Sequence, residues 1–179
     1  MRQPLEEGKV TISRAAGTMT FPSQFMLVAA MNPTPDGKMP HESKCSPREI
    51  QNYRGRISGP LLDRIDLLVE VPAVKAAELL TQPDGEPSAA VARRVVSARE
   101  RQQARQGVAN SELDAAALSH GVSLDPAARA FLQTAADRLG WSGRAVHRVL
   151  KVARTIADLA GSERIAATHL AEAVQYRRS

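Results

Sequence analysis

The chain has 179 residues and carries 24 Lys and Arg against 19 Asp and Glu, a net charge of +5. Its single cysteine excludes an internal disulfide, and no stretch reaches the roughly 18 apolar residues needed to span a membrane. With only 3% aromatic residues and abundant alanine, the composition favours packed helices over an all-β sandwich. No signal sequence is visible, so we expect a cytoplasmic protein without a membrane partner.

The chain begins with a pattern typical of a helix end followed by a β-hairpin. Residues 1–8 predict the last turn of a helix with Gly8 as its C-cap. Residues 9–13 and 18–21 then alternate apolar and polar side chains around a short turn, as the strands of a hairpin do. Such a hairpin carries Arg14 at its tip and Lys9 at its base. Both are candidate contacts for the phosphates of a nucleic acid, or charges on a hairpin that packs against a neighbouring subunit.

An apolar run at 25–31 predicts a central strand of a parallel sheet, and Asn32 ends it. Open α/β sheets bind ligands at the carboxyl ends of their strands, where a neutral amide can orient a water or a phosphate oxygen. Asn32 is therefore a candidate ligand-binding residue. The alternative is that Asn32 and Pro33 only open a turn.

A loop at 34–46 leads to a helix that we expect to start at Ser46 and run to about Arg56. Gly59 and Pro60 stop that helix and start a short turn that holds Arg64 on a rigid element. The apolar run at 67–71 predicts a second buried strand directly after it. Arg64 could then meet a phosphate at the sheet edge, or it pairs with Asp63 or Asp66 and only joins parts of the surface.

From residue 83 onward the chain predicts an all-helical domain, so we place a boundary between residues 82 and 83. The expected helices are 88–106, 112–120, 123–139, 143–160 and one from 167 or 168 to 176. The arginines of the first one either form a solvated face or contact nucleic acid. Arg144 lies in the first turn of a helix, where a cation gains nothing from the helix dipole, so its placement favours an external anion.

Four long motifs, taken together, resemble one family. They are residues 2–18, 25–33, 56–66 and 142–165, and they are similar in content and order to magnesium-chelatase-like AAA+ ATPases of the ComM/YifB branch. The phosphate-binding motif GxxxxGK[ST] does not occur in the sequence. The resemblance therefore implies the C-terminal portion of such an ATPase, after its Walker motifs, which should not hydrolyse ATP by itself. It predicts an α/β remnant of the ATPase core, residues 1–82, followed by a helical lid, residues 83–179.

The resemblance also implies roles for single residues. Arg64 is the candidate arginine finger, with Arg56 as the reserve, and both act on a nucleotide held by the next subunit of a ring, expected to be a hexamer. Asn32 and Arg144 match sensors one and two, which contact the nucleotide phosphates of ATP with Mg²⁺ in the complete protein. The hairpin bearing Arg14 and Lys9 matches one that enters the central channel in helicase members.

The loop at 34–46 departs from the family pattern. Many relatives carry paired CxC motifs there that look like a zinc site, whereas this chain keeps only Cys45, with Thr34, Asp36 and Ser43 at the other aligned places. One thiolate with scattered oxygens is a poor match to a closed zinc site, so we predict no zinc.

Three functions are compatible with these features. The first is part of a DNA branch-migration or helicase motor, favoured by the basic hairpin and by the ComM-like sequences of residues 58–66 and 153–163. The second is the ATPase subunit of a magnesium chelatase that inserts metal into a porphyrin. The third is a non-catalytic interaction module. A genome neighbourhood without the other chelatase subunits would argue against the second.

Overall fold

The computed structural model describes residues 2–15, 17–74 and 85–177. They form two compact units, Met1–Ile65 and Asp66–Ser179. The predicted boundary at 82/83 lies outside the described residues. The described chain is mainly helical with one two-stranded sheet, which confirms the expected fold class.

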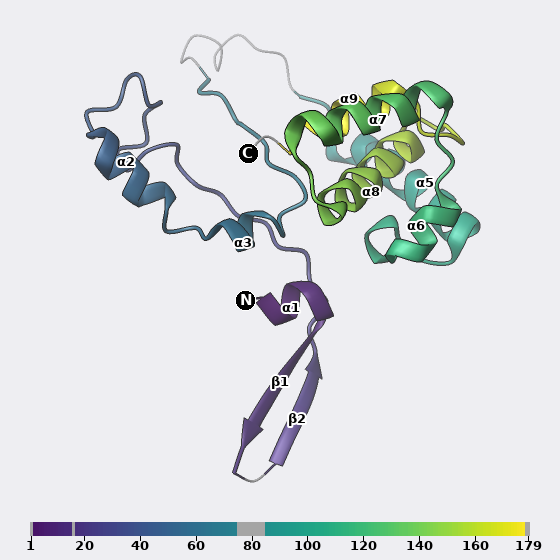
Figure 1. Ribbon diagram of the computed structural model, residues 1–179, viewed down its shortest axis with the longest axis horizontal. Helices are drawn as coiled ribbons and strands as arrows, with labels where there is room; N and C mark the ends of the chain where they lie inside the picture. The colour runs from purple at the N-terminus through teal and green to yellow at the C-terminus, as the bar shows by residue number, and fades with distance from the viewer. Residues whose placement is uncertain (1, 16, 75–84, 178–179) are drawn as a thin grey trace. The chain divides into compact units, whose positions relative to one another are not determined.

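The first unit starts with helix α1 (Arg2–Glu7) and an antiparallel hairpin of β1 (Lys9–Arg14) and β2 (Gly17–Pro22), seen in Figure 1. Gly8 joins helix and hairpin with φ 62°, a left-handed conformation that suits glycine, and its carbonyl accepts a hydrogen bond of 2.7 Å from the Ser23 amide. The pairing runs from Lys9 opposite Pro22 to Arg14 opposite Gly17. The predicted helix end and hairpin are thus confirmed.

The two predicted buried strands are wrong. Residues 25–31 and 67–71 are assigned to no strand, and their side chains are exposed: Met26 is 86% and Val71 85% accessible. A parallel strand is stable only when neighbours accept its backbone hydrogen bonds, and the described residues offer one sheet, the hairpin. Apolar content alone therefore predicted strands that this chain does not form.

Helix α2 (Pro47–Arg54) follows the 34–46 loop, and the short helix α3 (Gly59–Leu62) follows α2. Ser46 and Glu49 form a capping box at the start of α2: the Glu49 amide donates to the Ser46 hydroxyl, and the Ser46 amide donates to the Glu49 carboxylate. Proline at the first positions of both helices supplies a preset φ. Both predicted helical elements are confirmed.

The second unit is a helical bundle (Figure 1). Its elements are α5 (Ser88–Gln106), the 3₁₀ turn η1 (Asn110–Glu112), α6 (Ala115–Gly121), α7 (Pro126–Leu139), α8 (Gly143–Leu159) and α9 (Ala167–Gln175). Asp114, Asp125 and Ser142 accept hydrogen bonds from the first-turn amides of α6, α7 and α8. The predicted helices are confirmed, apart from later starts for the second, at Ala115, and the third, at Pro126.

Helix α8 is the centre of this bundle. Its inward face contributes Val149, Leu150, Ala153 and Ala157 to a core completed by Leu170 and Ala173 of α9 and by residues of the other elements. Trp141, the single tryptophan of the sequence, packs partly buried against the same core. Alanines at the helix contacts let the backbones approach closely, so a sequence poor in aromatic residues still fills its interior.

Candidate functional site

An open pocket of about 450 Å³ in the first unit brings together two predicted site residues, Asn32 and Arg56. Tyr53 and Ile57 complete its wall with Ala30 and Met31. Arg56 follows α2 closely in sequence, and its guanidinium carbon lies 6.0 Å from the centre of the Tyr53 ring. An amide, a cation and an aromatic ring at one hollow are suited to an anionic ligand with a planar or apolar part.

The other two arginines predicted to contact phosphate lie in different settings: Arg64 in the turn that follows α3, and Arg144 at the start of α8. The Arg64 guanidinium donates a hydrogen bond to the Pro60 carbonyl of the turn that carries it. Arg144 is exposed in the first turn of α8, as its position in the sequence predicted. One turn further along α8, Arg148 forms an ion pair with Asp66, with Nη1 at 2.8 Å from Oδ1. Asp66 was one of the two partners considered for Arg64.

The hairpin separates its two cations. Side chains alternate between the faces of a strand, so Arg14 shares a face with Ile12 and Lys9 shares the other with Thr11. The Thr11 and Thr20 hydroxyls lie 3.1 Å apart across the strands. Lys9 also lies 3.9 Å from the Glu7 carboxylate. Arg14 and Lys9 therefore do not share a surface.

In the 34–46 loop, the Asp36 carboxylate is the centre of a group of hydrogen bonds. Its carboxylate accepts hydrogen bonds from the Thr34 hydroxyl at 2.7 Å, the Ser43 hydroxyl at 2.8 Å and the Lys44 amide at 3.0 Å. These bonds, that from Thr34 foremost, hold the pKa of Asp36 well below its ordinary value. The Cys45 amide donates to Ser43 at 3.1 Å. All four residues at the aligned zinc places thus belong to one hydrogen-bonded group.

In the described part of the chain, no three His, Cys, Asp or Glu side chains gather so as to hold a metal ion. The absence of zinc in the protein stays a prediction. None of the helices in that part combines the length and the apolar character that a membrane crossing requires.

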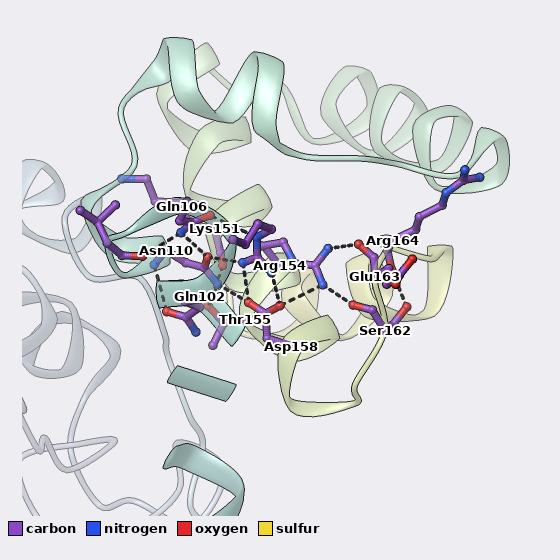
Figure 2. A network of polar contacts seen from close by, with 12 residues as sticks. Gln102, Gln106, Asn110, Lys151, Arg154, Thr155, Asp158, Ser162, Glu163 and Arg164 are labelled. Carbon is purple, nitrogen blue, oxygen red and sulfur yellow. Dashed lines mark hydrogen bonds and ion pairs between the residues drawn. The ribbon is translucent and has the colours of Figure 1, made fainter. Parts of the chain in front are cut away.

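The bundle also contains a polar network that the sequence did not reveal (Figure 2). Asp158 of α8 accepts two hydrogen bonds from Arg105 of α5, at 2.6 and 2.9 Å, and one from Asn110 at 2.9 Å. Arg154, one turn earlier on α8, lies 3.1 Å from the same carboxylate. Arg154 and Asp158 are 1% and 3% exposed, so they form a buried ion pair within α8, and the bonds from Arg105 join α5 to it.

Both buried charges are compensated. Burial alone would raise the pKa of Asp158, but the hydrogen bonds from Arg105 and Asn110 and the charge of Arg154 hold it below its ordinary value. Arg154 also donates to the carbonyls of Ser162 and Glu163, which follow the end of α8. Charged residues four apart beside the apolar stripe of a helix were the available sequence signal for this pair.

One arginine of the predicted basic face of α5 belongs to this buried network instead. Arg105 is a structural partner of Asp158, with its side chain only 29% exposed. Arg94 forms an exposed ion pair with Glu86 at 2.7 Å. The arginine-rich sequence of α5 therefore serves in part to hold the helix in the bundle.

Three features of this chain can be compared with known families. They are the hairpin followed by an apolar run that ends in Asn32, the turn bearing Arg64, and the helical bundle with Arg144 at a helix start. Two family models match this chain, "Magnesium chelatase, subunit ChlI" at residues 1–79 and "Magnesium chelatase, subunit ChlI C-terminal" at 85–177. The chain belongs to the magnesium chelatase family.

Individual relatives agree with this assignment. The chain is 46% identical to "Competence protein ComM" of Haemophilus influenzae, 43% to "Uncharacterized protein YifB" of Escherichia coli and 41% to YifB of Salmonella typhimurium. Each match covers 99% of this chain and 35% of the relative. The chain thus spans about a third of the length of these proteins, and the resemblance inferred from its motifs is confirmed.

Proposed function

We propose that this chain supplies the phosphate-sensing and lid portion of a ring-forming AAA+ ATPase that moves DNA, in the manner of a branch-migration or helicase motor. The observation that carries the proposal is the pocket shared by Asn32 and Arg56 in a chain of the magnesium chelatase family. The ring is expected to be a hexamer, and the protein to act in the cytoplasm.

The pocket residues fit a nucleotide phosphate. The Asn32 amide and the Arg56 guanidinium can both donate hydrogen bonds to phosphate oxygens, and Arg56 brings the opposite charge. The pocket wall holds no carboxylate, so Mg²⁺ would take its protein ligands from other parts of the complete protein. ATP and Mg²⁺ supply the transferable phosphoryl group and its charge compensation, while this chain orients the phosphate.

Exposed apolar side chains in both units support their being parts of a larger core. Val28 and Val69 are 79% and 65% exposed within the two runs predicted as strands. Leaving such runs in water costs the free energy that burial would provide, at about 25 cal/mol for each Å². We infer that other parts of the complete ATPase cover these apolar side chains.

Arg64 is the proposed arginine finger. Two features suit that role: in the turn after α3 the Arg64 amide donates to the Leu61 carbonyl at 2.9 Å, and the hydrogen bond to the Pro60 carbonyl orients its guanidinium. From there it would neutralise charge that develops on the phosphoryl group bound by a neighbouring subunit. Arg144 acts from the lid on the nucleotide of its own subunit, and Arg56 remains the reserve candidate for the finger.

The hairpin is the proposed DNA contact. Arg14 and Lys9 offer charge without a surface that could read base edges, so they should contact phosphates and tolerate any sequence. Because the two side chains lie on opposite faces, they should contact different phosphates. A single strand or a branched junction is the expected partner.

A chelatase subunit is the second candidate, favoured by the description of both matching family models. The two functions differ in what stimulates ATP hydrolysis. A DNA motor responds to branched or single-stranded DNA, whereas a chelatase subunit responds to its metal-insertion partners and a porphyrin.

The test is ATP hydrolysis by the complete protein, purified with and without DNA. We expect DNA to stimulate turnover and Asn32→Ala to reduce kcat by about 100-fold, the usual effect of losing one oriented donor at the reacting group. Arg48→Ala is the matched control, since Arg48 is an exposed arginine of α2 outside the pocket. No turnover in the wild type, or equal loss in both variants, would refute the proposal.

A further inference from the structure

The pocket in the first unit has two walls that are joined by the 34–46 loop and α2. One wall comes from residues 30–32, and the other from residues 53–57, at the end of α2 and just after it. Because α2 is a regular helix, the position of one wall relative to the other depends on how the 34–46 loop is folded. The loop therefore controls whether Asn32 and Arg56 share one hollow.

The Asp36 carboxylate is hydrogen-bonded to both ends of this loop. Near the start, Oδ1 accepts from the Thr34 hydroxyl at 2.7 Å. Near the end, the carboxylate accepts from the Ser43 hydroxyl at 2.8 Å and from the Lys44 amide at 3.0 Å. Ser46, two residues further on, caps α2. One carboxylate thus ties the segment that follows the first wall to the start of the helix that leads to the second.

The start of the loop is folded back against Asn32. Thr34 is buried, and its hydroxyl also lies 2.6 Å from the Lys38 carbonyl oxygen. The Gly37 amide donates to the Thr34 carbonyl at 3.1 Å, and Gly37 has φ 77°, a left-handed conformation that suits glycine. A carbon added at the Cβ position of Gly37 would lie 3.7 Å from Nδ2 of Asn32. The Asn32 side chain therefore lies beside loop backbone that Asp36 holds in place.

We propose that Asp36 is a positioning residue for the pocket, and that its carboxylate fixes the loop so that the Asn32 amide stays at the hollow shared with Arg56. Asp36 is not among the residues that line the pocket, so it acts through Asn32. An ionised carboxylate suits this role because its two oxygens accept several hydrogen bonds at once. What Asn32 does at the pocket rests on the proposed function, whereas how Asn32 is held does not.

The positioning can be tested by NMR in the 179-residue chain, from the nuclear Overhauser effect between the Asn32 side-chain amide and the Hα atoms of Gly37. We expect this effect in the wild type and its loss in Asp36→Asn, because an amide side chain cannot accept on both sides as the carboxylate does. Glu42→Gln is the matched control, since it removes an exposed carboxylate of the same loop that takes no part in the Asp36 hydrogen bonds. The control should keep the effect.

Thr34 supplies a second pair of variants. Thr34→Val removes the hydroxyl and should lose the effect, whereas Thr34→Ser keeps the hydroxyl and should retain it. Retention in Asp36→Asn or Thr34→Val would overturn the proposal, as would loss in Thr34→Ser or Glu42→Gln. Disappearance of the α2 amide signals together with the effect would assign Asp36 to the folding of the whole unit and would also refute a positioning role.

In the complete protein the readout is ATP hydrolysis. Asp36→Asn should lower kcat about tenfold with KM nearly unchanged, less than the roughly 100-fold of Asn32→Ala, because the donor is displaced and not removed. Added to Asn32→Ala, Asp36→Asn should cost nothing further, since it acts through Asn32, and multiplicative losses would refute this. If the wild type does not hydrolyse ATP, the proposed function fails, while the NMR experiment still decides whether Asp36 holds Asn32.

Discussion

Replacing Asp158 by alanine should destabilise the helical bundle far more than its single charge would suggest. The change removes the carboxylate that accepts hydrogen bonds from Arg105, Asn110 and Arg154. Arg154 is 1% exposed and would keep only the carbonyls of the turn after α8. Breaking a buried pair by removing one partner costs about 3–5 kcal/mol, because the remaining charge is left desolvated.

The assay is urea denaturation of the 179-residue chain, followed by the fluorescence of Trp141, which packs on the core of the bundle. Asp158→Ala should lower the free energy of unfolding by about 3–5 kcal/mol at pH 7. Glu86→Ala breaks a surface pair and should cost about 0–1 kcal/mol. Replacing Asp158 by Leu together with Arg154 by Met should recover part of the loss, since the buried charge of Arg154 is then removed while Arg105 and Asn110 still lack their acceptor.

The pH dependence follows from the same carboxylate. The pKa of Asp158 is lower in the folded chain, so its contribution to stability is fully present above the unfolded pKa of about 3.9. It is lost as the pH falls through the lower folded value. The difference in unfolding free energy between wild type and Asp158→Ala should therefore shrink below about pH 4. A cost for Asp158→Ala no larger than that of Glu86→Ala would refute a buried, stabilising network.

The other predictions concern the site residues. The chain by itself should show no ATP turnover, since its sequence has no GxxxxGK[ST] motif, and turnover that survives rigorous purification would contradict this. In the complete protein, Arg64→Ala should abolish ATP turnover while nucleotide affinity is largely kept. Mixing this variant with a Walker-lysine variant should restore some activity. Co-assembled mixtures that stay inactive would exclude the arginine-finger role. In salt titrations of DNA binding by the assembled ATPase, Arg14→Ala and Lys9→Ala should each reduce the slope of log affinity against log salt by about one. The two effects should add, because the side chains lie on opposite faces of the hairpin. Unchanged slopes would assign the hairpin to subunit packing. Because the pKa of Asp36 is depressed, its carboxylate stays ionised at pH 4, so the Lys44 amide should be as well protected from hydrogen exchange at pH 4 as at pH 7 in the wild type. Asp36→Asn should lose this protection. Loss of protection in the wild type at pH 4 would count against the network around Asp36.

Local chemistry made most of the elements predictable. Ser46 with Glu49, and Ser142 before α8, are caps whose partners lie within three residues, so the helix starts could be placed from the sequence. Gly8 marks a helix end for the same reason. The long motifs also sufficed to recognise the family, which the matching family models confirm.

Long-range contacts could not be predicted in this way. The run at 25–31 has the composition of a buried strand, but strand formation depends on neighbours that no local pattern supplies. Arg105 meets Asp158 across 53 residues and Asp66 meets Arg148 across 82, and nothing in the local sequence distinguishes these partners from other charged residues nearby.

Family and helices follow from the sequence alone, which also singles out candidate residues for phosphate contact. Which residues come together depends on packing. Asn32 and Arg56 share one pocket, Arg14 and Lys9 lie on opposite faces of the hairpin, and Asp66 pairs with Arg148 of α8. The physical reason is that caps and periodicity act within one or two turns, whereas a buried charge or a pocket exists only when packing brings distant segments together and excludes water.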